Sequence, residues 1–107
     1  MILTPEQLIK LAELGYDEDC EHYYNTVTDC FQHFSSNATV KWPDIPDVLR
    51  WLRNKGYKYS ITPAVLSNKV SYEIYTHTEV IKVDSWEEAE YEIMSRLIEI
   101  EYDRICI

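Results

Sequence analysis

The sequence has 107 residues, of which 46% are apolar and 27% are charged, so one globular domain over residues 1–107 is expected rather than a disordered chain. Its formal net charge is −9. It has no apolar run of the roughly 18 to 20 residues that cross a membrane and no signal-peptide pattern, which favours a cytoplasmic protein. With two glycines and an odd set of three cysteines, it has neither a glycine-rich phosphate loop nor a disulfide framework.

The N-terminal segment predicts a helix over residues 5–14. Thr4 stands at its N-cap position, Gln7 lies where its side chain would close a capping box, and Gly15 is the expected stop. One face is apolar and carries Leu8, Leu11 and Ala12. We therefore expect this helix to pack on the core through that face.

A hairpin is predicted next. Residues 22–28 and 31–42 are rich in Tyr, Val, Thr and Phe, which favours strands over helix. Ser35-Ser36-Asn37 predicts a turn or a break within the second strand.

A second helix is expected between Asp44, at its N-cap with Asp47 three residues on, and Gly56, which ends it. Its apolar face carries Ile45, Val48, Leu49 and Leu52, whereas Arg50, Arg53 and Asn54 project away.

Two further strands are predicted from alternation. The first carries Tyr57, Tyr59 and Ile61 and is ended by Pro63, and the next follows a turn at Ser67-Asn68-Lys69. In that strand Val70, Tyr72 and Ile74 alternate, but Ile81 and Val83 are out of phase with them. The change of phase predicts a bulge or a turn near residues 76–79.

A final helix begins at Ser85, with Glu88 at the capping-box position. Its predicted buried face carries Trp86, Ala89, Ile93, Leu97 and Ile100, widened on one side by Met94 and Ile98. The opposite face carries Glu88, Glu92 and Glu99. The predicted fold is α+β, in the order α-β-β-α-β-β-α, with the helices packed on a mainly antiparallel sheet.

Two clusters resemble metal sites in residue type only. Cys20, His22, Cys30 and His33 could supply zinc ligands, but their spacing matches no familiar zinc finger, and buried cysteines with surface histidines are the favoured interpretation. The acids of residues 17–21 lack the central glycine and distal glutamate of a calcium loop, so a solvated turn is favoured. No metal, cofactor or catalytic residue is predicted, and we expect no enzyme.

Charge is distributed unevenly along the chain. Residues 1–36 hold seven acids and one lysine, and residues 84–107 hold eight acids and two arginines, whereas residues 41–58 hold five cations and two acids. Arg50, Arg53, Lys55, Lys58 and Tyr59 form a basic corner with an aromatic ring, which is typical of RNA or DNA contacts. The alternative is that these cations solubilise the helix end and complement its dipole while the neighbouring rings enter the core.

The acidic ends favour another partner. An acidic protein can occupy the basic groove of a nucleic-acid-handling protein, with Glu88, Glu92 and Glu99 as a steering face and exposed aromatic rings as anchors.

Two segments resemble a group of small phage and prophage accessory proteins for which no activity is established. The first is Leu11-x-x-Leu14-Gly15-Tyr16-Asp17-x-x-Cys20, and the second is Pro46-Asp47-Val48-Leu49-Arg50-Trp51-Leu52-Arg53-x-Lys55. The resemblance implies an accessory gene of a mobile element, where small acidic proteins often inhibit host defence, CRISPR ribonucleoproteins included. We therefore expect a non-enzymatic inhibitor that binds a host protein. The alternatives are a structural phage module, for which a homodimer through a sheet edge is one form, and a small nucleic-acid-binding domain.

Overall fold

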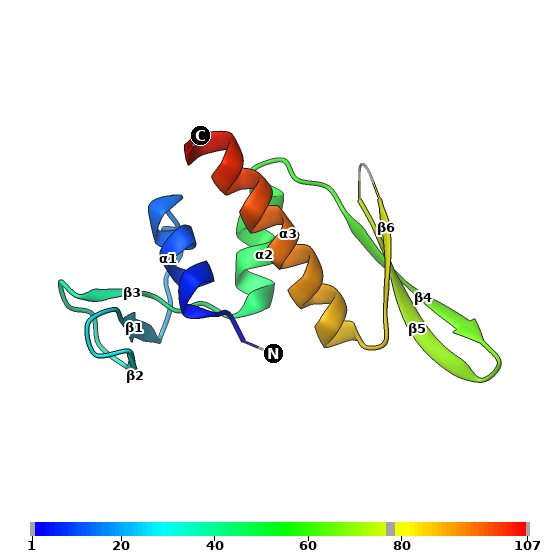
Figure 1. The fold of residues 1–107 in the computed structure, drawn as a ribbon, viewed down its shortest axis with the longest axis horizontal. Helices are drawn as coiled ribbons and strands as arrows, with labels where there is room; N and C mark the ends of the chain where they lie inside the picture. The colour runs from blue at the N-terminus through cyan, green and yellow to red at the C-terminus, as the bar shows by residue number, and fades with distance from the viewer. Residues whose placement is uncertain (1, 77–78, 107) are drawn as a thin grey trace.

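The computed structural model describes residues 2–76 and 79–106 and has the element order α-β-β-β-α-β-β-β-α. The predicted α+β class is confirmed, but the strands form two separate three-stranded antiparallel sheets instead of one. Figure 1 shows the helices in the middle of an elongated molecule, with one sheet at each end. The molecule measures 51 × 30 × 20 Å, and its radius of gyration, 15.3 Å, exceeds the value of about 13 Å that is usual for this length.

Helix α1, Pro5–Glu13, begins at the predicted residue and ends one residue earlier than predicted, with Leu14 as its C-cap. Thr4 accepts a hydrogen bond from the backbone of Gln7, and the Gln7 side chain accepts one from the backbone of Thr4, so the capping box is complete. Gly15 follows with a φ of +85°, a conformation that disfavours any residue with a Cβ. Leu8 and Leu11 are buried, whereas Ala12 is exposed.

Sheet A consists of β1 (Tyr23–Asn25), β2 (Cys30–Gln32) and β3 (Thr39–Lys41) in the order β2-β1-β3. The predicted second strand is divided at the expected break, and its two parts pair with opposite edges of β1. Tyr24 lies directly opposite both Phe31 and Val40, so these three side chains share the face that is turned toward α1. Among the strands of sheet A, β3 makes the main contact with α1, and Phe31 of β2 remains 47% exposed.

Helix α2, Ile45–Asn54, ends before Gly56, which has a φ of +104°. The predicted cap at Asp44 is wrong in one respect: its side chain makes no cap hydrogen bond, and only its backbone carbonyl accepts the first helical bonds. Val48, Leu49 and Leu52 are buried as predicted, and Trp51 is also buried, at 7% exposure.

Sheet B consists of β4 (Ser60–Leu66), β5 (Lys69–Tyr75) and β6 (Val80–Val83), with β5 in the centre. β4 begins at Ser60 rather than Tyr57, and Pro63 does not end it but pairs with Tyr72. In a two-residue hairpin the closing pair, here Leu66 and Lys69, is hydrogen bonded, and successive pairs then alternate between non-hydrogen-bonded and hydrogen-bonded. By this alternation Pro63 and Tyr72 form a non-hydrogen-bonded pair. The missing N–H of Pro63 therefore points to the free edge of the sheet and costs no ladder bond.

Both connections in sheet B are turns. Ser67 and Asn68 have φ values of +53° and +64°, as the predicted turn requires. Ile74 lies opposite Ile81 and Tyr72 opposite Val83, so a turn, and not a bulge, brings the two out-of-phase series to one face. The Thr76 backbone N–H donates to the Glu79 carbonyl at 3.0 Å; the rest of the predicted turn, residues 77–78, lies outside the described residues.

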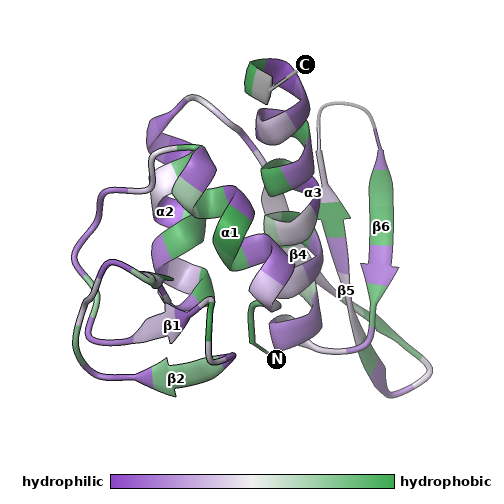
Figure 2. Ribbon diagram, turned by 60° about the vertical axis from the view of Figure 1, so that its left-hand side comes forward, coloured by the Kyte–Doolittle hydropathy of each residue, from purple (hydrophilic) through white to green (hydrophobic). Residues whose placement is uncertain are grey.

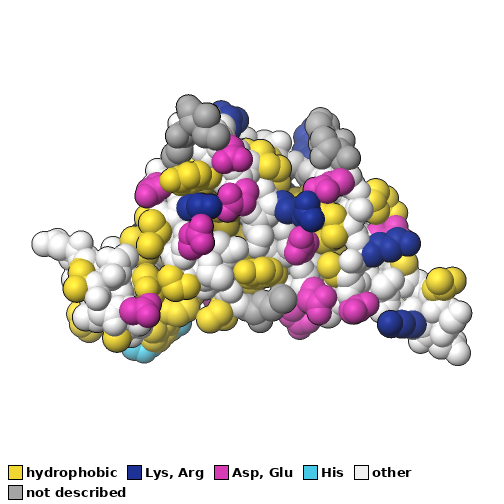
Figure 3. Space-filling view, viewed as in Figure 1, with side chains coloured by type: hydrophobic (Ala, Val, Ile, Leu, Met, Phe, Trp, Pro, Cys, Tyr) yellow, Lys and Arg dark blue, Asp and Glu magenta, His cyan; other side chains and the backbone are white. Residues whose placement is uncertain are grey.

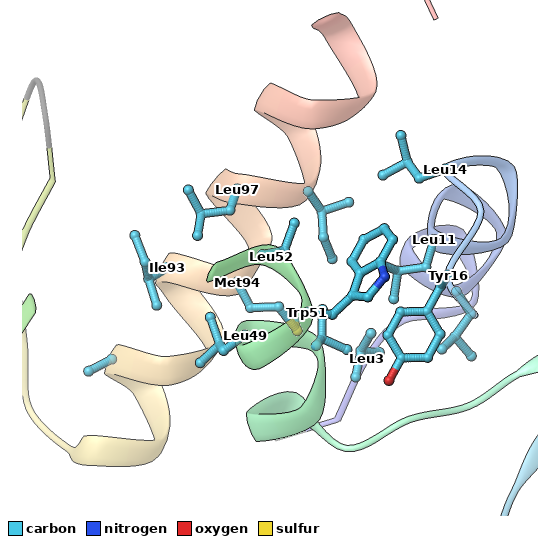
Figure 4. Close-up of a cluster of buried hydrophobic side chains, with 14 of the residues drawn as sticks. Leu3, Leu11, Leu14, Tyr16, Leu49, Trp51, Leu52, Ile93, Met94 and Leu97 are labelled. Carbon is cyan, nitrogen blue, oxygen red and sulfur yellow. The ribbon is translucent and has the colours of Figure 1, made fainter. Parts of the chain in front are cut away.

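Helix α3, Trp86–Cys106, runs through the centre of the molecule and packs against α1, α2, β5 and β6. Figure 2 shows hydrophobic and hydrophilic segments alternating along it, and Figure 4 shows its buried side chains beside those of α2. The predicted buried face is wrong at its ends, since Trp86 is 44% and Ile100 52% exposed. Ala89, Ile93 and Leu97 are buried as predicted, and Met94 and Ile98, predicted to widen the face, are fully buried because α3 has neighbours on two sides. No helix among the described residues is long and apolar enough to cross a membrane.

Candidate functional site

The basic corner predicted at the end of α2 is folded onto its own aromatic rings. The Arg53 guanidinium lies over the Tyr59 ring, 4.4 Å from its centroid, and the Lys55 ammonium lies 4.5 Å from the Trp51 centroid. The Trp51 indole N–H also donates to Asp17 at 3.2 Å. A base that stacked on either ring would have to displace the cation that already covers it.

The other two cations of the corner differ. The Arg50 guanidinium lies 3.3 Å from an Asp47 carboxylate oxygen, one turn away on α2. Lys58 is exposed and makes no ion pair with any residue that the structure describes. Burial raises the pKa of the neighbouring Tyr59, against the opposing effect of Arg53. The arrangement matches the alternative in which cations finish a helix and rings enter the core.

The predicted acidic steering face is partly neutralised. Glu99 accepts a hydrogen bond from Lys10 of α1 at 2.6 Å, and Glu92 accepts one from Arg96 at 3.1 Å. The bond to Glu99 is the main cause that raises the pKa of Lys10. Glu88, the third acid, is half-buried. The field of this face is therefore weaker than its sequence predicts.

The imidazole rings of His22 and His33 lie together, with centroids 5.1 Å apart, but each thiol bonds a backbone carbonyl. The Cys20 thiol donates to the carbonyl of His22, and the Cys30 thiol donates to the carbonyl of Thr28. The favoured interpretation, buried cysteines with surface histidines, is wrong for Cys30, which is exposed, and for His22, which is half-buried. Among residues 2–76 and 79–106 no group of three or more His, Cys, Asp or Glu side chains is placed to hold a metal ion. The histidines take part in an aromatic cluster instead.

That cluster, which the sequence did not predict, is here called the aromatic face and consists of His22, Phe31, His33 and Trp42. The Phe31 ring centroid lies 4.7 Å from that of His22, 5.1 Å from that of His33 and 5.0 Å from that of Trp42. Phe31 is 47% exposed and the nearby Phe34 is 67% exposed. Figure 3 shows hydrophobic side chains, in yellow, and a small histidine patch, in cyan, at the sheet A end of the molecule.

An acidic cleft of about 310 Å³ adjoins the aromatic face and shares His22 and Trp42 with it. Its carboxylates are those of Asp19, Glu21, Asp44 and Asp47. Apart from the Asp47–Arg50 contact, none of them forms an ion pair within the described chain. Asp19 and Glu21 are thus exposed, as predicted for the 17–21 segment, whereas Asp17 accepts the Trp51 N–H. Asp19 and Glu21 also line the cleft beside the half-buried His22 and Trp42, a position that depends on the pairing of β1 with β3.

A buried carboxylate was also missed. Glu101 has no exposed surface and accepts hydrogen bonds from the Tyr57 hydroxyl and the Arg104 guanidinium. Burial raises the pKa of this carboxyl, but the two hydrogen bonds outweigh it, so the pKa lies below its ordinary value. Glu101 lies one helical turn after the apolar residues Leu97 and Ile98, on the same face of the helix. That spacing in the sequence predicts that its side chain is buried.

Comparison of the chain with models of protein families, with curated proteins and with solved structures finds no match.

Proposed function

We propose that this chain is a non-enzymatic binding protein that places its aromatic face and acidic cleft against a basic surface of a partner protein. The observation that carries the proposal is that the aromatic face and the acidic cleft form one continuous surface. His22 and Trp42 belong to both, with exposed rings on one side and four carboxylates on the other. Exposed aromatic rings are typical anchors of protein interfaces, and neighbouring carboxylates select and attract a cationic partner.

The partner class follows from charge and from the phage resemblance. A net charge of −9 favours a strongly basic partner, and the grooves of proteins that handle nucleic acids are basic surfaces of that kind. A bacterial host protein of this class, such as a defence ribonucleoprotein, would be inhibited by a protein that occupies its groove in the cytoplasm. The steering assigned to Glu88, Glu92 and Glu99 then belongs chiefly to Asp19, Glu21 and Asp44, because Glu92 and Glu99 have cationic partners of their own.

The proposal is tested first by capture from host lysate with and without nuclease. We expect one protein that survives nuclease, is lost from Phe31→Ser with Phe34→Ser, and is retained by Val65→Ser with Leu66→Ser. The control removes two apolar side chains that are even more exposed, 71% and 79%, from the opposite end of the molecule. Loss from both variants, or capture of nucleic acid alone, contradicts the proposal.

Association kinetics with the captured partner then test the acids. At low salt, Asp19→Asn with Glu21→Gln is expected to slow association about three- to tenfold. Glu92→Gln with Glu99→Gln makes the same change in net charge and is expected to slow it less than about twofold, since those acids are already paired. Equal effects would show that only net charge matters and that the cleft is not the contact.

A further inference from the structure

A cavity of about 460 Å³ lies between the C-terminal half of α3 and one end of sheet B, far from the aromatic face. β6 and α3 are joined by two residues and diverge from that connection, as Figure 1 shows, so the space between them widens away from it. Figure 3 shows the resulting hollow in the surface. The cavity thus follows from a short connection between a helix and a strand that run in different directions.

The lining is mostly apolar. Ile93, Leu97 and Ile100 line it from α3, and Tyr57 lines it from the connection between α2 and β4. The Tyr57 hydroxyl is held by the buried Glu101, which fixes the orientation of the ring. A volume of this size, with apolar walls and few polar groups, is typical of sites for small molecules rather than for extended peptides.

Two cations stand among the described lining residues, and they are not equivalent. Arg96 donates to Glu79 at 2.6 Å and to Glu92 at 3.1 Å, so its charge is already compensated. Lys58 has no carboxylate partner among the described residues. Within the part of the lining that the structure describes, the charge without a counter-ion is therefore positive and lies at Lys58.

We propose that this cavity binds a small amphipathic anion, an apolar chain or ring that ends in a carboxylate. The apolar part lies on Ile93, Leu97 and Ile100, and the carboxylate meets Lys58. The site is independent of the aromatic face, so a partner protein and this ligand occupy different ends of the molecule.

Decanoate below its micelle concentration is the probe, and decanol and decylammonium are its uncharged and cationic counterparts. We expect saturable binding of decanoate by calorimetry, with chemical-shift changes at Lys58, Leu97 and Ile100, and weaker binding of the other two. Absence of saturable binding, or decylammonium bound as tightly as decanoate, would overturn the proposal.

Variants separate the charge from the cavity. Lys58→Gln is expected to weaken decanoate about fivefold and leave decanol unchanged, whereas Lys69→Gln, at the tip of the β4–β5 hairpin, changes neither. Ile100→Trp narrows the opening and is expected to weaken both ligands at least about tenfold. Its control, Ile105→Trp, replaces an equally exposed residue of α3 that does not line the cavity. Equal binding by all four variants would place the ligand elsewhere, whatever the outcome for the partner protein.

Discussion

Glu101 shows how one residue can contradict the pattern around it. Seven other acids lie in residues 84–107, and most of them are at least partly exposed, yet this carboxylate has no exposed surface. A buried charge is costly unless it is hydrogen bonded, and Tyr57 and Arg104 supply those bonds from two different segments. The residue therefore links the connection after α2 to the last turns of α3.

Replacing Glu101 by Gln is expected to destabilise the protein by about 2 kcal/mol at pH 7, because charge-assisted hydrogen bonds are lost in a buried site. The folded pKa lies below the ordinary value of 4.5, so the unfolded chain takes up the proton first as the pH falls. The contribution of Glu101 is thus complete above about pH 4.5 and is lost as the pH falls through the folded pKa. Urea unfolding of both proteins between pH 7 and pH 3 measures this.

The matched control is Glu99→Gln, which removes a more exposed carboxylate two residues away and is expected to cost no more than about 1 kcal/mol. A difference between wild type and Glu101→Gln that stays constant down to pH 3 would show that its charge is not the stabilising feature.

At the scale of elements, the two shorter helices begin in different ways although their sequences look alike. Thr4 and Gln7 close a complete capping box on α1, whereas the side chain of Asp44 makes no bond to α2 and lines the acidic cleft. The Asp44 side chain, which makes no hydrogen bond with the described part of the chain, is thus available for the contact proposed above.

Thr4→Ala is accordingly expected to cost about 1 kcal/mol of the free energy of unfolding, and Asp44→Ala less than about 0.5 kcal/mol. The measurement is urea unfolding in about 0.5 M NaCl, where the attraction of the Asp44 charge to the helix dipole is screened. A larger loss for Asp44→Ala than for Thr4→Ala would mean that its side chain does cap α2 in solution.

The free edge of β4 in sheet B is poorly suited to pairing with a second copy of the chain. The free edge of β4 carries Pro63 at a position whose N–H would point outward, so the edge lacks a donor in its middle. This feature opposes the alternative in which two copies pair through that edge.

At the scale of the whole molecule, the core is central and the sheets are peripheral. Of the buried apolar side chains that the structure describes, all but two lie outside the sheets; the exceptions are Tyr24 and Ile74. An elongated molecule of this size leaves large apolar side chains exposed at both ends. Local stability should therefore fall from the helices toward the sheets.

Hydrogen exchange tests this directly. The amides of Leu52 and Ile98, in fully buried parts of α2 and α3, are expected to exchange only through global unfolding. Those of Tyr24 and Thr26, which bond within sheet A or to its connecting loop, are expected to exchange faster by opening of that sheet. Equal protection of the two groups would show that sheet A unfolds together with the core.

Several features were predictable because they depend on neighbours in the chain. The capping box of α1, the stops at Gly15 and Gly56 and the turn at Ser67 and Asn68 are local, and all are confirmed. Two predicted strands are each divided in the structure, and Ser35-Ser36-Asn37 and the change of phase before Ile81 indicated these divisions. No local pattern indicated that the strands form two sheets.

The class, the helices and the charge follow from the sequence alone, because capping, hydrophobic period and composition are properties of short segments. Which charges are compensated depends on contacts between distant segments: Lys10 and Arg96 neutralise Glu99 and Glu92, and Arg53 covers Tyr59. Such contacts also bring His22, Phe31, His33 and Trp42 onto one face and form the cavity between α3 and the end of sheet B. These features join residues far apart in the chain, and pairing of strands and divergence of elements are set by the packing of the whole domain.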